Sequence, residues 1–307
     1  MKGKMLVLGS SNIDCVLRIP RFHQPGETIR GRDPVIVFGG KGANQAIAAR
    51  RLGAKVGFVT KLGHDHYGET YRWYLIKNGL DRRHLLRDEE LPTGMAFIEL
   101  IPKGENRIVV SPGANASLSG RDLKGAVKDW KGVKVFLTQL EIPLLTVKSG
   151  LQMARAQGVL TLLNPSPPLS PATNLFSFVD YLVLNQWEAQ LFSRTRITET
   201  SDLRKVAQKL LYLGARNVII TLGSKGLFFR NKQEEIRMRA FRVEVVDSTA
   251  AGDAFMAGLA CGLLEGKEIH EALEFASGAG TLAATKLGAQ PSLPFRKELE
   301  NFLRRAR

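Results

Sequence analysis

Cysteine is scarce in this chain of 307 residues, which contains only Cys15 and Cys261. Two cysteines so far apart form neither a disulfide framework nor a paired metal-binding motif, so a reducing compartment is expected. Long apolar runs are also missing, since no stretch approaches the roughly 20 apolar residues that span a bilayer. The N-terminal apolar run is too short for a signal peptide. We therefore predict a cytoplasmic protein with no membrane partner.

Neither common glycine-rich nucleotide motif is present in FGGKGANQA, residues 38–46. A P-loop would need glycine at position 35 and Ser or Thr after the lysine, where the chain has Val35 and Gly42. A dinucleotide fingerprint would need glycine in place of Gln45. What remains is a glycine turn that leads into a helix, with Lys41 and Asn44 near its start. Such a turn suits a polyhydroxylated or anionic ligand, or is simply a tight turn with a capping asparagine.

A basic stretch interleaved with aromatic residues is absent as well, although the formal net charge is +15. Lysine and arginine are spread along the whole chain. We therefore expect a solvated basic surface that helps to attract anionic ligands, and no nucleic-acid partner.

Strand-like and helix-like segments alternate along the chain. Short apolar runs such as KMLVLGS, KVFLTQL, DYLVLN and RNVIITLG are separated by helical patterns, including 142–158 and 200–215, the latter with a cap near Ser201. This alternation predicts an α/β fold with a mostly parallel sheet, whose ligands bind at the carboxyl ends of the strands. Four β-like segments at 14–19, 33–40, 94–100 and 106–113 lack intervening helices and suit a small projecting sheet.

Asp253 follows small residues in STAAGDAFMAGLACGLL, residues 248–264. The N–H groups of Ala250 to Asp253 are expected to be free donors at a helix N-terminus, which suits an anion that gains charge in a transition state. Asp253 itself is either a general base or only a first-turn helix acid. Asn185 and Glu188, three residues apart, are similarly either ligands of a cation or phosphate, or a helix cap and a first-turn acid.

Ten segments together resemble the ribokinase family of carbohydrate kinases. They occur in the family's order from about residue 4 to the C-terminus: VLGSSNID, PGET, FGGKGANQA, PGANASLS, QLE, LNPSPP, NQWE, TLGSKG, VDSTAAGDAF and KLGAQPSLP. The resemblance implies a three-layer α/β/α domain over residues 1–307, with a mostly parallel central sheet. It also implies a small β-sheet lid whose strands are inserted at about 12–19, 33–40 and 94–112.

The resemblance further implies phosphorylation of D-ribose at O5 by ATP, giving D-ribose 5-phosphate. Asp253 would be the catalytic base, and backbone groups of Ala250, Ala251 and Gly252 would complete an anion hole with it. The sugar would be bound by Asn12, Asp14, Gly40, Lys41, Asn44, Glu141 and Asp253.

ATP and metal sites are implied in the same way. The nucleotide would be bound by Asn185, Thr221, Gly223, Ser224, Gly226, Gly252 and Ser277, with Glu188 acting indirectly on Mg2+. A monovalent cation, normally K+, would lie at Asp247, Thr249, Ala283, Lys286, Gly288 and Ser292, several of them acting through carbonyl oxygens.

Two departures bear on these expectations. Ser277 stands where a histidine or asparagine is common near the adenine, and Lys286 replaces a common arginine. A kinase for deoxyribose, a nucleoside or another sugar is the alternative on the same scaffold, followed by a non-catalytic sugar-binding or nucleic-acid-binding protein. The exposed edge of a lid sheet also predicts a homodimer through the lids.

Overall fold

A nine-stranded sheet forms the centre of the computed structural model, which describes residues 3–102, 105–128 and 130–306. The strand order is β13-β12-β11-β10-β9-β8-β1-β4-β5, and only the pairs that involve β12 and β13 are antiparallel. The strands are β1 (Lys4–Leu8), β4 (Lys55–Gly63), β5 (Leu85–Asp88), β8 (Val133–Thr138), β9 (Leu160–Leu163), β10 (Tyr181–Asn185), β11 (Asn217–Thr221), β12 (Leu227–Arg230) and β13 (Glu235–Met238). The predicted mostly parallel sheet is confirmed.

Helices cover both faces of this sheet because its strands are apolar on both sides. In β1, Met5 and Val7 join one hydrophobic cluster, whereas Leu6 and Leu8 join the other. The first cluster packs against α1 (Lys41–Arg51), α2 (His66–Lys77), α7 (Ala251–Leu264), α8 (Ile269–Ala284) and α9 (Arg296–Ala306). The second packs against α3 (Gly120–Ala126), α4 (Leu144–Ala156), α5 (Gln186–Ser193) and α6 (Thr200–Tyr212). The three-layer architecture is therefore confirmed.

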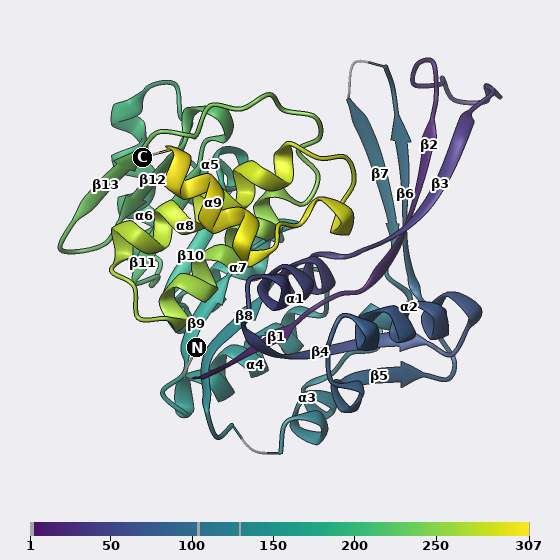
Figure 1. Cartoon of the computed structure of the whole chain (residues 1–307), viewed down its shortest axis with the longest axis horizontal. Coiled ribbons are helices and arrows are strands. Elements are labelled where there is room, and N and C mark those ends of the chain that lie inside the picture. The colour runs from purple at the N-terminus through teal and green to yellow at the C-terminus, as the bar shows by residue number, and fades with distance from the viewer. Residues whose placement is uncertain (1–2, 103–104, 129, 307) are drawn as a thin grey trace.

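A second, smaller sheet projects from the large one, as Figure 1 shows. Its strand order is β3-β2-β6-β7, with one parallel pair, β2 with β6, between two antiparallel pairs. The strands are β2 (Asn12–Arg18), β3 (Arg32–Gly39), β6 (Gly94–Leu100) and β7 (Asn106–Ser111). They coincide closely with the four segments that lacked intervening helices in the sequence.

Local capping explains where helix α6 begins. Helix α6 begins two residues earlier than a cap at Ser201 allows, because Glu199 is the N-cap and forms a capping box with Asp202. Within the described part of the chain, five short 3-10 helices connect other elements, at Arg82–His84, Gly113–Ser117, Ser170–Phe178, Gly223–Lys225 and Gln290–Ser292. None of the helices built from the described residues is both long and apolar enough to span a bilayer.

Candidate active site

A cavity of about 200 Å³ lies where β10 and β11 end and the N-termini of α1 and α7 meet. This is the sheet edge at which a doubly wound fold binds its ligands. Seven residues predicted from the sequence line the cavity: Lys41, Asn185, Glu188, Thr221, Ala250, Gly252 and Asp253. They come from segments separated by up to about two hundred positions, and the cavity brings together the glycine turn before α1 and the N-terminus of α7.

The N-terminus of α7 is exposed to this cavity. Ala250 is the N-cap and has the left-handed conformation, with φ of 60°. Among the described residues, no acceptor bonds to the N–H groups of Ala250, Gly252 and Asp253, so these can bind an anion at the positive end of the helix dipole. Ala251 differs from the prediction, because its N–H already donates to the carbonyl oxygen of Ser248 at 3.2 Å. The tight turn that the left-handed Ala250 produces closes this bond.

Asp253 is buried, with 5% of its surface exposed, and both of its carboxylate oxygens accept hydrogen bonds. Asn44 Nδ2 donates to Oδ2 at 3.0 Å, and Gln45 Nε2 donates to Oδ1 at 2.9 Å. Burial raises the pKa of Asp253, while nearby Lys41 and the two amide donors oppose that rise. A carboxylate with a raised pKa is better matched to proton abstraction near neutral pH than an exposed one.

Lys41 begins α1 and faces several carboxylates. Burial alone would lower its pKa, but the negative charges of Asp253, Glu141, Glu188 and Asp14 outweigh that effect and raise it. The ammonium group therefore remains protonated and partly balances the carboxylates around it.

The glycine turn before α1 follows the course that its sequence predicted. Gly40 has φ of 88°, and a Cβ there would stand 2.7 Å from the backbone nitrogen of Asn12. The turn brings the backbone N–H of Lys41 to Glu141 Oε2 at 3.0 Å, and Ser10 Oγ donates to the same oxygen at 2.5 Å. Glu141 thus lies beside the turn, although it comes from the segment that follows β8.

Asn12 and Asp14 lie on β2 of the small sheet. Asn12 is buried, and its Oδ1 accepts a hydrogen bond from Asn115 Nδ2 at 2.7 Å. Burial, followed by the negative charges of Glu141 and Asp253, raises the pKa of Asp14 to about 7, although Lys41 opposes the shift. Asp14 therefore lies within electrostatic reach of Asp253, on the side of the small sheet.

Asn185 and Glu188 form a capping box at the start of α5. Asn185 Oδ1 accepts from the Glu188 N–H at 2.8 Å, and Glu188 Oε2 accepts from the Asn185 N–H at 2.9 Å. Asn185 and Glu188 therefore do form a helix cap and a first-turn acid, which was one of the two alternatives for this pair. Both residues nevertheless line the cavity, and Glu188 Oε1 and Asn185 Nδ2 make no hydrogen bond within the described part of the chain, so they can bind a ligand.

Of the remaining residues predicted to bind the nucleotide, Thr221 lines the cavity, whereas Gly223, Ser224, Gly226 and Ser277 lie outside its lining. Thr221 ends β11 and its hydroxyl donates to the Leu184 carbonyl oxygen at 3.3 Å. Gly223 and Ser224 belong to the following 3-10 helix, and Gly226 ends it. Ser277 lies on α8, where its hydroxyl contacts the sulfur of Met238 at 3.8 Å.

Asp247 ties together the two loops predicted to hold a monovalent cation. Its Oδ1 accepts from the N–H of Thr249 at 2.9 Å and from its hydroxyl at 2.6 Å, while Oδ2 accepts from the Gly288 N–H at 2.8 Å. The Lys286 ammonium group pairs with Glu298 at 2.6 Å. Lys286 can therefore contribute only its backbone carbonyl. Ala283 lies in the last turn of α8, and Ser292 ends the 3-10 helix Gln290–Ser292, where its hydroxyl donates to the Ala289 carbonyl oxygen at 2.7 Å.

Several polar residues of the site were not predicted as ligands from the sequence. Asn164, Ser166 and Ser248 line the cavity, and Gln45 contacts Asp253 directly. Asn164 could have been found, because it ends a predicted strand, and Gln45 is adjacent to the predicted Asn44. For Ser166 and Ser248 the sequence offers no signal beyond their position in motif segments.

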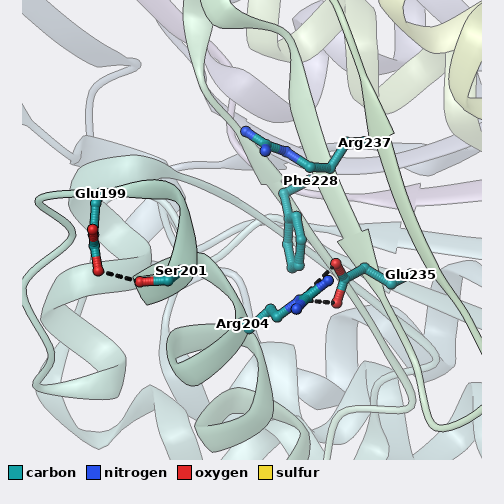
Figure 2. Close-up of a pocket in the computed structure, with 6 residues that line it drawn as sticks. All are labelled: Glu199, Ser201, Arg204, Phe228, Glu235 and Arg237. Atoms are coloured by element: carbon teal, nitrogen blue, oxygen red, sulfur yellow. Dashed lines mark hydrogen bonds and ion pairs between the residues drawn. The ribbon is translucent and has the colours of Figure 1, made fainter.

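A second cavity of about 490 Å³ is unrelated to this site. It is lined by Glu199, Ser201, Arg204, Phe228, Glu235 and Arg237 (Figure 2). Arg204 Nε donates to both carboxylate oxygens of Glu235, at 2.8 and 2.9 Å. The lining comes from the start of α6 and the β12–β13 hairpin and includes none of the predicted site residues, so the smaller cavity at Asp253 is the candidate active site.

Comparison with known proteins agrees with this architecture. The family model described as pfkB family carbohydrate kinase matches residues 2–296. The chain is 39% identical over 306 residues to a ribokinase of Haemophilus influenzae, covering 100% of both sequences. A crystal structure of a Thermotoga maritima ribokinase is 38% identical, with a TM-score of 0.88 over 98% of this chain and 99% of that one.

An Arabidopsis thaliana ribokinase, solved in complex with ribose and ATP, has a TM-score of 0.90 and 30% identity over 99% of both chains. These similarities extend over almost the whole length and include both sheets. The chain belongs to the pfkB family of carbohydrate kinases.

Proposed function

We propose that this protein transfers the γ-phosphoryl group of ATP to O5 of D-ribose. The observation that carries the proposal is the position of Asp253, a buried carboxylate with a raised pKa at a helix N-terminus whose N–H groups face the same cavity. A base and an anion-binding turn are needed side by side for phosphoryl transfer to an alcohol.

The sugar side is supported by its supply of donors and acceptors. Asn44 Oδ1 is buried without a hydrogen-bond partner among the described residues, because its Nδ2 donates to Asp253. A sugar hydroxyl that donates to this oxygen would remove the cost of leaving it unpaired. Asp14 and Glu141 supply carboxylate acceptors, and Asn12 Nδ2 supplies a donor, which suits the vicinal hydroxyls of a pentose.

In the proposed reaction the 5-hydroxyl proton moves to a carboxylate oxygen of Asp253 while O5 bonds to the γ-phosphorus. The bond between that phosphorus and the bridging oxygen of ADP breaks, so ADP leaves with the electron pair. The N–H groups of Ala250, Gly252 and Asp253 bind the equatorial oxygens as negative charge develops on them. Lys41, which lines the same cavity, adds positive charge there.

The residues present also fit the two cations that such a reaction uses. No group of three or more His, Cys, Asp or Glu side chains in residues 3–102, 105–128 and 130–306 forms a metal site. Mg2+ would therefore be bound mainly by ATP phosphates, with Glu188 Oε1 as the carboxylate near it. A monovalent ion would be held by the two loops that Asp247 joins, where carbonyl oxygens suit a hard cation. Both ions, when bound, would supply positive charge that stabilises the phosphoryl group.

We further propose that residues 1–307 act as one catalytic domain in the cytoplasm, with the small sheet as a lid over the sugar. In support, the small sheet carries Asn12 and Asp14 and leads directly through Gly40 into α1. Both cysteines are free, as suits a reducing compartment.

The test is an ADP-release assay with ribose, deoxyribose, fructose 6-phosphate and adenosine, each with and without K+. The expected result is the highest kcat/KM with ribose, and ribose 5-phosphate as the product. Faster turnover of deoxyribose or adenosine would instead establish the alternative acceptor on this scaffold. If no acceptor stimulates ADP release, the chain is a binding protein, and salt-sensitive binding of DNA at low micromolar concentration would identify it as a nucleic-acid-binding one.

A further inference from the structure

Two glutamine side chains form a line of hydrogen bonds that ends on Asp253. Gln139 Nε2 donates to Gln45 Oε1 at 2.5 Å, and Gln45 Nε2 donates to Asp253 Oδ1 at 2.9 Å. Both glutamines are fully buried. They lie 94 positions apart in the sequence, Gln45 on α1 and Gln139 directly after β8. Neither was predicted as a ligand of the sugar or of ATP.

The chemistry of the three groups fixes the direction of this line. An ionised carboxylate only accepts hydrogen bonds, so Gln45 must turn its NH2 group toward Asp253. Its carbonyl oxygen then faces Gln139, which in turn must present its own NH2 group. Gln139 Oε1 is left facing the opposite way, buried and without a hydrogen-bond donor in the described part of the chain. A buried acceptor without a donor destabilises the folded state. The two glutamine amides keep this orientation despite that cost.

Backbone packing holds Gln139 in place. A Cβ at Gly9 would lie 2.1 Å from Gln139 Oε1, so the side chain occupies the space that this glycine leaves free. Gly9 follows β1, beside the glycine turn that begins α1. Close packing of this kind restricts the rotamers of Gln139 and, through it, those of Gln45.

We propose that Gln45 is a positioning residue for the catalytic base and that Gln139 is its anchor, together orienting the Asp253 carboxylate and keeping it ionised. This inference rests on the proposed function. Asn44 donates to the other carboxylate oxygen of Asp253, Oδ2, and belongs to the proposed sugar site. The proposed role of the two glutamines therefore concerns Oδ1 alone. Neither glutamine lines the catalytic cavity.

The charged groups around Asp253 set the expected direction of a pH effect. Lys41 on α1 and the amides of Asn44 and Gln45 lower its pKa, while burial and Glu141 raise it, and Asp14 faces it from the small sheet. Removal of the Gln45 donor therefore raises the pKa of Asp253 further. The carboxylate then becomes protonated at a higher pH, and the acidic limb of the kcat profile moves to higher pH.

The experiment measures kcat and sugar KM from pH 5.5 to 9 for Gln45→Met, Gln139→Met and the double variant. Methionine keeps the side-chain length and removes the hydrogen bonds. Gln45→Met is expected to lower kcat by about 10-fold or more through misorientation of the base. The sugar KM should change much less, and the acidic limb should move upward. Gln139→Met should give a smaller shift in the same direction.

The double variant shows whether Gln139 acts through Gln45 or independently of it. If Gln139 acts only through Gln45, the double variant is no worse than Gln45→Met alone, whereas additive losses would overturn the assignment. Thr161→Val is the matched control, because it deletes a buried hydroxyl of β9 that binds the Phe178 carbonyl oxygen at 2.8 Å and makes no contact with Asp253. It should lower Tm without moving the acidic limb.

An unmoved acidic limb in folded Gln45→Met contradicts the proposal. If that variant does not fold, the limb of Gln139→Met decides the question alone. Failure of the proposed function has a different signature, since the wild-type chain would then show no sugar-dependent ADP release at any pH.

Discussion

The environment of Asp14 disfavours its ionised form. Burial and two neighbouring carboxylates raise its pKa to about 7. An ionised carboxylate is the stronger acceptor for sugar hydroxyls. If binding requires this form, ribose should bind about 10-fold more tightly at pH 8 than at pH 6, in proportion to the ionised fraction. Calorimetric titration measures this directly, and Asp14→Asn should bind weakly with no pH dependence in this range.

The ionised form of Asp14 is expected to strengthen ribose binding but to destabilise the fold. A raised pKa means that the folded state binds more protons than the unfolded state, so stability falls as pH rises from about 4 to about 7. Asp14→Asn should therefore raise Tm at pH 8, with a gain in the free energy of unfolding of at most about 4 kcal/mol, and have little effect near pH 4.

Asp202 provides a control of opposite sign, because its pKa is lowered by hydrogen bonds from Thr198 and Glu199. Its contribution to stability is present above the unfolded pKa and is lost as pH falls, so Asp202→Asn should lower Tm at pH 8. A lower Tm for Asp14→Asn at pH 8 would contradict the assignment of its raised pKa.

Single residues also show where sequence reasoning reaches its limit. The sequence left Asn185 and Glu188 as either ligands or a cap, and the structure makes them a capping box that also lines the cavity. Local spacing determines such a cap, so it could be predicted. Gln139 could not, because its partner is 94 positions away and two amides that meet in a core leave no local pattern.

At the level of elements, the N-terminus of α7 can be tested at Gly252. A Cβ at this position would meet no atom within 4 Å, and the residue has no positive φ. Gly252→Ala should therefore leave Tm nearly unchanged while its methyl group enters the cavity where we propose that the phosphoryl group binds. We expect kcat to fall by about 10-fold or more, toward the loss seen when an anion-hole donor is removed.

Gly125→Ala is the matched control for this change. Gly125 lies on α3, where a Cβ would also meet nothing within 4 Å, and it is outside the cavity lining. Unaltered turnover in Gly252→Ala, measured by ADP release, would mean that the start of α7 does not hold the phosphoryl group.

The loop before α7 and the loop after α8 form the second element that can be tested. Asp247 joins Thr249 to Gly288, and Gln290 in the second loop donates to Tyr71, whose hydroxyl donates to the Gly39 carbonyl oxygen. Turnover should be higher in K+ than in a large organic cation. Asp247→Asn should weaken the cation affinity by about 10-fold or more, because the groups that orient the loop are lost. Equal rates in both salts would refute a cation site here.

The elements themselves were largely predictable. Apolar runs of strand length gave the central strands, and missing helices marked the small sheet. The pairing of β2 with β6 could not be read from the sequence, because 82 positions separate the paired residues and register is decided in three dimensions. The bonded N–H of Ala251 was missed for a related reason, since it depends on the left-handed conformation of Ala250.

At the scale of the whole molecule, the net charge of +15 contrasts with a site that gathers Asp14, Glu141, Glu188 and Asp253 around one lysine. A positive molecule attracts the ATP anion over long range, and salt screens this attraction. The positive charge of a kinase can therefore serve to attract ATP and does not require a nucleic-acid partner. The absence of nucleic-acid binding stays a prediction.

The small sheet also bears on assembly. Its edge strands are β3 and β7, and they expose the apolar side chains Val35, Ile36, Ile108, Val109 and Val110. Open apolar edges are commonly covered by another chain, so we predict a homodimer through the two lids. Light scattering after size exclusion should give twice the 33.9 kDa chain mass. Val109→Lys should reduce the mass to that of a monomer, while Leu145→Lys, at an exposed position of α4, should leave the dimer intact.

The most direct measurement of the central claim is the turnover of Asp253→Asn with ribose and ATP·Mg, with binding of both ligands measured in parallel. Asparagine keeps the shape of the side chain and removes the base. The account predicts nearly normal binding and a loss of kcat of at least about 10²-fold. A variant that binds ribose and ATP and turns over at the wild-type rate would contradict it.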